Sequence, residues 1–411
     1  MVSPFMTDAE KLAAVRAALP SLAAAIQLNT GSVGPLPAEV AAAMAEIEAY
    51  ERDVGRAQYE YFVDTLQRMD EARAAVAAVI GGDLDEVALT HATTDGLNLA
   101  TWALDWRAGD RAVTTTHEHA GALGPLYALR DRLGLELGFA EFEGGASDDE
   151  IVASFDRAIG EGARLVSCSH VLWTTGTVLP VARIAALARE RGAITLVDGA
   201  QAAGAIPVAA RDLGAQMYSV PAQKWLLGPE GMGALWVARE FLSQARSTFN
   251  SFLSWASYDA RGSYEPQPDA RRFQVSNFHR PSIVGMARSI GWLTMFVGLE
   301  FVHRRVAEMA GRAHDALSAI DGLTVLTPRD RMAGLVTFRI GGWEAKAALD
   351  ELAARTFAIA RTVPPLEAIR ISLGFWTSEA EIERFVDGVR LLARHAPGSL
   401  PPRRTLTIVD R

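Results

Sequence analysis

The sequence is poor in cysteine and lacks any long hydrophobic run. Its 411 residues include one cysteine, Cys168, so no disulfide can form within the chain and no cysteine-based metal cluster is expected. No stretch comes near the roughly 20 consecutive apolar residues that a membrane span needs. Residues 1–19 lack the cationic start and the apolar core of a signal peptide. We therefore expect a cytoplasmic protein with no membrane partner and no metal.

A surplus of positive charge is also missing. The chain has 40 lysine and arginine residues against 49 aspartate and glutamate residues, a net charge of −9. Nucleic acid is therefore not expected as a partner, because phosphate backbones are bound by basic surfaces. Apolar residues make up 49% of the chain and charged residues 22%, which is typical of a globular protein. The length is sufficient for two domains.

Lysine is used only three times, at Lys11, Lys224 and Lys346, and arginine supplies the other 37 cationic residues. Arginine stays protonated and cannot form a Schiff base under physiological conditions. Lys11 and Lys346 lie in polar helical segments, where no chemical role is expected. Lys224 follows an apolar strand, where burial would lower the pKa of its amine and favour imine chemistry. The alternative is a side chain that extends to the surface.

Short apolar runs alternate with helical patterns up to residue 237. The expected strands are 87–90, 111–116, 135–142, 165–169, 194–197, 217–220 and 233–237. This alternation predicts an α/β fold with a mostly parallel, seven-stranded sheet that binds its ligand at the carboxyl ends of the strands. Beyond it we expect an irregular stretch over 243–274, a long helix over 281–320 and a small α+β unit. The predicted domains are 29–255 (large) and 1–28 with 256–411 (small).

Polar residues follow several of these strands. Asp198 comes directly after the strand 194–197, where a buried carboxylate needs a cationic partner unless it caps the next helix. Thr93 and Thr94 precede a helix, whose free N–H groups could bind a phosphate or could simply be capped. His119 follows the strand 111–116, and its imidazole could stack on an aromatic cofactor or serve only the fold.

Two arginines in the second unit, Arg361 and Arg370, flank an apolar segment. An arginine in a pocket can bind a substrate carboxylate through two parallel hydrogen bonds. In a chain with so many arginines, a structural role is the alternative for either one.

The order of these signals resembles the class V aminotransferase family of fold type I enzymes, which use pyridoxal 5′-phosphate (PLP). The family includes cysteine desulfurases, selenocysteine lyases, cystine C–S lyases, isopenicillin N epimerases and kynureninases. The resemblance covers nearly the whole chain from Leu28 onwards. It is carried by Thr93-Thr-Asp-Gly-Leu-Asn98, His117-Glu-His119, Ser169-His170, Trp173-Thr-Thr-Gly176, Val197-Asp-Gly-Ala-Gln201, Gln223-Lys-Trp225 and Arg370-Ile-Ser372.

The resemblance implies PLP as the cofactor and a role for each matching residue. Lys224 would hold PLP as a Schiff base and move the Cα proton, Asp198 would pair with the pyridine nitrogen, and His119 would stack on the ring. The other expected cofactor contacts are Thr93, Thr94, Asp95 (through its backbone), Gln201 (at the ring hydroxyl), Ser219, Gln223 and Asn277. An amino-acid substrate would be bound by Arg370 (at its carboxylate), Arg361, Asn29 and Trp173. The family also implies a homodimer whose site is completed at the interface, with the segment 272–277 reaching the neighbour's phosphate.

The expected phosphate site departs from the family pattern at three positions. Gln223 stands where the family usually has histidine, and an amide can donate a hydrogen bond but carries no charge. Pro221 replaces a hydroxyl residue and donates nothing. Asn277 replaces a threonine. We expect Ser219 to compensate for these losses.

The segment before Arg370 bears on the reaction. A cysteine desulfurase needs a mobile-loop cysteine there that takes up sulfur, and residues 361–369 contain none. The segments 169–180 and 359–365 resemble the C–S lyase and isopenicillin N epimerase-like branch. We therefore predict a C–S β-lyase that converts a cysteine S-conjugate or cystine-like amino acid to a thiol or persulfide, pyruvate and ammonia. The alternatives are an epimerase, a decarboxylating or oxidatively deaminating enzyme of a biosynthetic pathway, and a non-catalytic binding module of the same fold.

Overall fold

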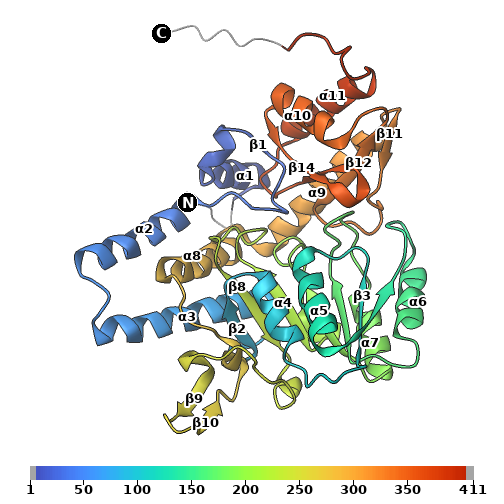
Figure 1. Ribbon diagram of the computed structural model, residues 1–411. Helices are drawn as coiled ribbons and strands as arrows, with labels where there is room; N and C mark the ends of the chain where they lie inside the picture. Colours follow the sequence, from blue (N-terminus) through green and yellow to red (C-terminus); the bar gives the residue numbers. More distant parts are fainter. Residues whose placement is uncertain (1–5, 404–411) are drawn as a thin grey trace.

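A seven-stranded sheet lies at the centre of the computed structural model, which describes residues 6–403 (Figure 1). The strand order is β2-β8-β7-β6-β5-β3-β4, and β8 is the one strand of this sheet that runs antiparallel to its neighbours. The predicted mostly parallel sheet is therefore confirmed. Its strands are β2 (Val87–Thr90), β3 (Arg111–Thr115), β4 (Glu136–Ala140), β5 (Leu165–Ser169), β6 (Ile194–Asp198), β7 (Met217–Pro221) and β8 (Gly233–Val237).

Helices surround this sheet because its central strands are buried along their whole length and read as nearly continuous apolar runs. Helix α3 packs on β2, α4 packs across β6, β7 and β8, and α7 packs on β5 and β6. The helices of this part are α2 (Ala38–Asp53), α3 (Tyr59–Ile80), α4 (Thr93–Thr101), α5 (Ala120–Leu133), α6 (Asp148–Ile159) and α7 (Val181–Glu190).

A second, four-stranded sheet in the order β11-β12-β15-β14 forms the small unit at the top of Figure 1. Near the N-terminus, β1 pairs in parallel with β13, which joins the first part of the chain to this unit. The domain boundaries stay a prediction. The elements of the N-terminal segment and of this unit are α1 (Asp8–Ala17), β1 (Ile26–Gln27), α9 (Leu299–Ser318), β11 (Leu323–Val325), β12 (Leu335–Ile340), α10 (Ala345–Thr356), β13 (Ala358–Ile359), β14 (Arg361–Val363), β15 (Ala368–Ser372) and α11 (Glu379–Ala393).

The prediction of one continuous helix over 281–320 is wrong, because the structure divides this segment into two helices. Helix α8 (Arg280–Gly291) continues into a π-helical turn (Trp292–Val297), and Gly298 then adopts a φ of +87°, which favours glycine. The buried Lys11 amine donates to the carbonyl of Val297 at 3.0 Å and so helps to end this turn. The axis bends by 86° before α9. Lys11 thus has a structural role that its helical context did not indicate.

The stretch predicted as irregular over 243–274 contains a hairpin of β9 (Trp255–Tyr258) and β10 (Tyr264–Pro266). Within residues 6–403, no single helix has the length and apolar composition to cross a membrane, and the bent pair α8–α9 passes that test only when its two helices are joined.

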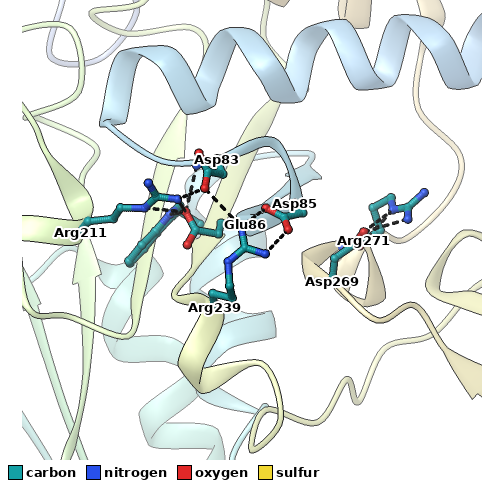
Figure 2. Close-up of polar contacts among 8 residues, drawn as sticks. Asp83, Asp85, Glu86, Arg211, Arg239, Asp269 and Arg271 are labelled. Carbon is teal, nitrogen blue, oxygen red and sulfur yellow. Dashed lines mark hydrogen bonds and ion pairs between the residues drawn. The ribbon is translucent and has the colours of Figure 1, made fainter.

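A cluster of ion pairs holds the turn before β2 against the sheet (Figure 2). The buried Glu86 carboxylate accepts hydrogen bonds from Arg211 Nη2 at 2.7 Å and from Trp236 Nε1 at 3.0 Å. Around Glu86, Arg211 pairs with Asp83, and Arg239 Nη2 lies 3.2 Å from the Asp83 carboxylate. The outer members of the cluster are exposed, so Glu86 is expected to carry most of its stabilising effect.

Replacement of Glu86 by alanine should lower the free energy of unfolding by about 1–3 kcal/mol, because the buried Trp236 N–H then has no acceptor. Asp85→Ala is the matched control, since this half-buried carboxylate pairs only with Arg239 among the described residues and should change stability by less than about 1 kcal/mol. Urea denaturation followed by circular dichroism measures both. Equal losses in the two variants would contradict the assignment.

Candidate active site

A cavity of about 240 Å³ lies where the carboxyl ends of the central strands face the small unit. It brings together ten predicted site residues from both parts of the chain: Thr93, Thr94, Trp173, His119, Asp198, Gln201, Gln223, Lys224, Arg361 and Arg370. Ligands of open parallel sheets bind at this edge, so the cavity is the candidate active site.

Asp198 and Lys224 supply the opposite charges at the floor of this cavity. Asp198 is the last residue of β6 and accepts a hydrogen bond from the Ala200 N–H at 2.8 Å. Burial raises the pKa of its carboxyl, and the neighbouring Lys224 opposes this rise. Burial lowers the pKa of Lys224 to about 8, against the attraction of Asp198. The amine therefore has a neutral fraction near pH 8, which nucleophilic and basic chemistry requires.

His119 and Trp173 form an aromatic wall. His119 caps α5, and its Nδ1 accepts a hydrogen bond from the Gly121 N–H at 3.1 Å, so a neutral imidazole carries its proton on Nε2. Burial, and then the charge of Lys224, lower the pKa of His119 and favour this neutral form. The Trp173 ring meets the imidazole edge-on, with centroids 5.6 Å apart. A planar aromatic group can stack on such an imidazole.

The start of α4 has the features of an anion site. Its N-cap residue is Ala92, which offers no side-chain acceptor to the free N–H groups of the first turn. The buried Thr93 hydroxyl has no hydrogen-bond partner within the described chain. Behind it, the Ser219 hydroxyl donates to the Thr93 carbonyl at 3.0 Å and fixes the helix start. Free backbone donors, an unpaired hydroxyl and the helix dipole together suit a phosphate.

Gln201 is held in one orientation at the next strand end. Its Nε2 donates to the Gly31 carbonyl at 2.8 Å, and its Oε1 accepts from Trp225 Nε1 at 3.0 Å. One amide N–H remains for a ligand, because a primary amide has two. A Cβ atom at Gly31 would lie 2.9 Å from Arg370 Nη2 and 3.0 Å from Gln201 Oε1, so a larger residue here would displace these side chains.

Arg361 and Arg370 are direct partners across the antiparallel pair β14–β15, which places their side chains on the same face. Arg370 is fully buried. Its Nη1 donates to the Trp173 carbonyl at 2.7 Å, whereas Nε and Nη2 have no partner within the described residues. Burial, and then the charge of Arg361, lower the pKa of Arg370 to about 9. Like charges directly opposite each other are destabilising, so this pair indicates an anionic ligand.

Arg361 is less enclosed than Arg370. Its guanidinium lies over the Trp173 ring, 5.4 Å from the centroid, and Nη1 donates to the Ser32 hydroxyl at 3.3 Å. It therefore lies beside the aromatic wall formed by His119 and Trp173.

Four predicted residues do not line this cavity. The Asp95 carboxylate turns to His91 at 3.2 Å, and the Asn277 carbonyl lies 3.1 Å from Nε2 of the same histidine. Asn29 accepts a hydrogen bond from Ser32 at 2.9 Å, and Ser219 lies beneath the start of α4 rather than in the cavity.

Two serines that the sequence motifs did not indicate as site residues line the cavity, Ser32 and Ser169. Ser169 ends β5 in register with Asp198. The strand-end rule that identified Asp198 could also have identified Ser169.

These features fit PLP. The cavity holds a lysine of lowered pKa, a buried carboxylate for a ring nitrogen, an amide N–H for a ring hydroxyl and a helix N-terminus for a phosphate. Within residues 6–403, no group of three or more metal-ligating side chains could hold a metal ion.

Comparisons with known proteins agree with this geometry. The family described as Aminotransferase class-V matches residues 32–385. An isopenicillin N epimerase of Streptomyces clavuligerus is 30% identical over 89% of this chain and 94% of its own length. A probable cysteine desulfurase of Methanothermobacter thermautotrophicus is 28% identical over 80% of this chain and 82% of its own.

Solved structures extend the likeness to the fold. The cystine C–S lyase C-DES, in complex with its product cysteine persulfide, has a TM-score of 0.86 and 26% identity, and the alignment covers 92% of this chain and all of that one. A lysine-to-alanine variant of C-DES carries glycine covalently linked to its PLP cofactor, with the same TM-score. The family match spans most of the sequence and confirms the predicted fold and cofactor. The chain therefore belongs to the class V aminotransferase family and is a PLP-dependent enzyme.

Proposed function

We propose that the enzyme is a C–S lyase that acts by β-elimination on a cysteine S-conjugate or a cystine-like amino acid. The observation that carries the proposal is the opposed pair Arg361 and Arg370 beside Lys224 in one cavity. One guanidinium can bind the α-carboxylate of an amino acid. The second then favours a substrate with another anionic group beyond the sulfur, as in cystine or a carboxylated conjugate.

Each of the main residues of the cavity has a role in the proposed reaction. Bound PLP supplies an electron sink that stabilises negative charge at the substrate Cα. The unpartnered Nε and Nη2 of Arg370 can hold the α-carboxylate through two parallel hydrogen bonds. The Lys224 amine, with a pKa of about 8, removes the Cα proton. The Asp198 carboxylate would keep a proton on the ring nitrogen of bound PLP, and the His119 imidazole would cover the ring.

The end of the reaction needs little help from the protein. When the Cβ–S bond breaks, the electron pair leaves with sulfur as a thiolate, or as a persulfide anion from cystine. The eliminated 2-aminoacrylate takes up water to give pyruvate and ammonia. A thiolate is a good leaving group, so a strong general acid is not required.

Sulfur uptake by the protein itself is not part of the proposal. The one cysteine, Cys168, is fully buried in β5, and burial raises the pKa of its thiol. Residues 361–369 span β14, the short turn after it and the start of β15, and they contain no cysteine. A persulfide-forming desulfurase would need a thiol in that place.

The second candidate is epimerisation at Cα, which is favoured by the relative named isopenicillin N epimerase at 30% identity. Both reactions begin with loss of the Cα proton to Lys224. They differ in the next step, because an epimerase returns the proton on the other face and a lyase expels the group at Cβ.

We also propose that two copies of the chain form a dimer. Exposed aromatic side chains gather on α3 and on the β9–β10 segment: Tyr59, Phe62, Phe252, Tyr258 and Tyr264. Asn277 lies near them and lines a groove with Phe62, Phe252 and Arg280. An interface there would cover this apolar surface and would give Asn277 access to the partner's cavity.

A product assay distinguishes the two reactions. The PLP-loaded enzyme is incubated with cystine, cysteine S-conjugates with and without a second carboxylate, and an unconjugated control such as alanine. We expect pyruvate and a thiol or persulfide in equal amounts, with carboxylated substrates preferred. Inversion at Cα without pyruvate would refute the lyase proposal in favour of epimerisation, and release of CO₂ without pyruvate would refute both.

A further inference from the structure

Glu118 is a buried carboxyl that the proposed reaction does not use. It lies in the loop between β3 and α5, and the residue is 5% exposed. Its Oε1 accepts hydrogen bonds from the Ser169 N–H at 3.0 Å and from the Thr115 hydroxyl at 2.8 Å. Its Oε2 lies 2.5 Å from the Ser169 hydroxyl oxygen. The carboxyl thus bridges the ends of the neighbouring strands β3 and β5.

Ser169 stands between this carboxyl and the candidate active site. It is the register partner of Asp198 across the parallel strands β5 and β6, so the two side chains project from the same face of the sheet. Both residues line the cavity. The Ser169 hydroxyl therefore has Glu118 on one side and the cofactor pocket on the other.

The surroundings favour a proton on Glu118. Burial raises its pKa to about 7 against the hydrogen bonds from Ser169, and the charge of Asp198 acts in the same direction as burial. Burial raises the pKa of the Cys168 thiol, and the charges of Glu118 and Asp198 raise it further. The titratable groups at this end of the neighbouring elements are His117 and His119 in its own loop, Cys168 in β5, His170 after β5, Asp198 in β6, Tyr218 in β7 and Lys224 after β7.

The protonation state of Glu118 determines whether the Ser169 hydroxyl can donate a hydrogen bond into the cavity. A hydroxyl has one hydrogen to donate. When Glu118 is protonated, its O–H can donate to the Ser169 oxygen, and the Ser169 hydrogen is free to point into the cavity. When Glu118 is ionised, Ser169 must donate to it and presents only lone pairs to the cavity.

We propose that Glu118 is a positioning residue that, through Ser169, sets whether the cavity wall beside Asp198 offers PLP a hydrogen-bond donor or only an acceptor. The inference concerns the PLP-loaded enzyme before substrate binds. It therefore does not depend on whether the reaction is a β-elimination.

The test is a pH titration of the visible absorbance of the PLP-loaded protein without substrate. Glu118→Gln is nearly isosteric and stays neutral, and its amide can accept where Oε1 accepts and donate to Ser169 where Oε2 lies. We expect a spectral component with a midpoint near pH 7 in the wild type. It should be absent in Glu118→Gln and in Ser169→Ala, and the spectrum of Glu118→Gln should match the low-pH wild type throughout.

Several outcomes would overturn the proposal. A wild-type midpoint in Glu118→Gln would remove Glu118 from the effect. Loss in Glu118→Gln but retention in Ser169→Ala would show that the carboxylate acts by its charge and not through the hydroxyl. The control Glu46→Gln changes an exposed carboxylate on α2 and should titrate as the wild type does.

An infrared difference spectrum across pH 7 gives a second readout, which holds even if Glu118→Gln fails to fold. The wild type should show a protonated carboxyl band that is lost as the pH rises, and in Ser169→Ala the loss should move to higher pH, because the hydrogen bond from the Ser169 hydroxyl lowers the pKa of Glu118. A Glu118 that is ionised on both sides of pH 7 would show no such band and would contradict the proposal.

Discussion

Replacement of Lys224 by alanine is expected to abolish the visible absorbance band of the Schiff base between the protein and PLP, recorded without any amino acid, and to lower kcat by about 10²–10⁴-fold or more, the usual range for loss of a general base. The reason lies in the electrostatics of the cavity. Burial lowers the pKa of the Lys224 amine to about 8, and no other lysine lines the cavity. Arginine cannot replace it, because the guanidinium stays protonated.

The matched control for this variant is Lys346→Ala. Lys346 lies on α10, is exposed and pairs with Asp350 on the same helix. Its loss should leave the spectrum and kcat unchanged. Absorbance spectra and single-turnover kinetics measure both variants. A Lys224→Ala protein that keeps the wild-type spectrum and rate would show that the cofactor is attached elsewhere.

The sheet and much of the site could be predicted because both depend on local patterns. Apolar runs of strand length between helical segments indicate a parallel sheet, and residues that follow such runs meet at one edge. Asp198, Lys224 and His119 were found in this way, and the structure places all three around one cavity.

Other features depend on register or on single residues and were missed for that reason. The apolar periodicity of 281–320 continues through Gly298, so the pattern carries no sign of the break there. Arg361 and Arg370 are separated in the sequence by a connection whose conformation fixes their register, and their direct opposition is visible only in the paired strands. Glu118 lies between His117 and His119, and the motif gave a role to His119 alone. The buried contacts of Glu118 are made with Ser169, which comes from a strand far along the chain.

Arg370 is the residue whose replacement should have the second large effect. Arg370→Met keeps most of the side-chain volume but removes the buried guanidinium, so the two hydrogen bonds expected to the substrate α-carboxylate are lost. Truncation of one member of a buried charge pair costs about 2–5 kcal/mol, which corresponds to a loss in kcat/KM of about 30- to 4000-fold, since each 1.4 kcal/mol is tenfold. The loss should apply to every amino-acid substrate.

Stability is expected to respond differently from activity in this variant. Without substrate, Arg370 is a buried cation directly opposite Arg361, an arrangement that destabilises the fold. Its removal takes away that repulsion, although the Trp173 carbonyl loses a donor at 2.7 Å. The free energy of unfolding without substrate is therefore expected not to fall, although kcat/KM falls steeply. Such a trade-off is common where residues needed for function lower the stability of the fold.

Arg361→Met separates the two arginines. Because Arg361 lies beside Trp173 and not in the fully buried position, its loss should weaken only substrates with a second anionic group, and mainly through KM. Kinetics with the carboxylated and uncarboxylated conjugates measure this difference, and urea denaturation measures stability. Equal losses for both substrate classes in Arg361→Met, or a loss of stability in Arg370→Met as large as its loss of transition-state binding, would mean that the pair serves the fold and not an anionic substrate.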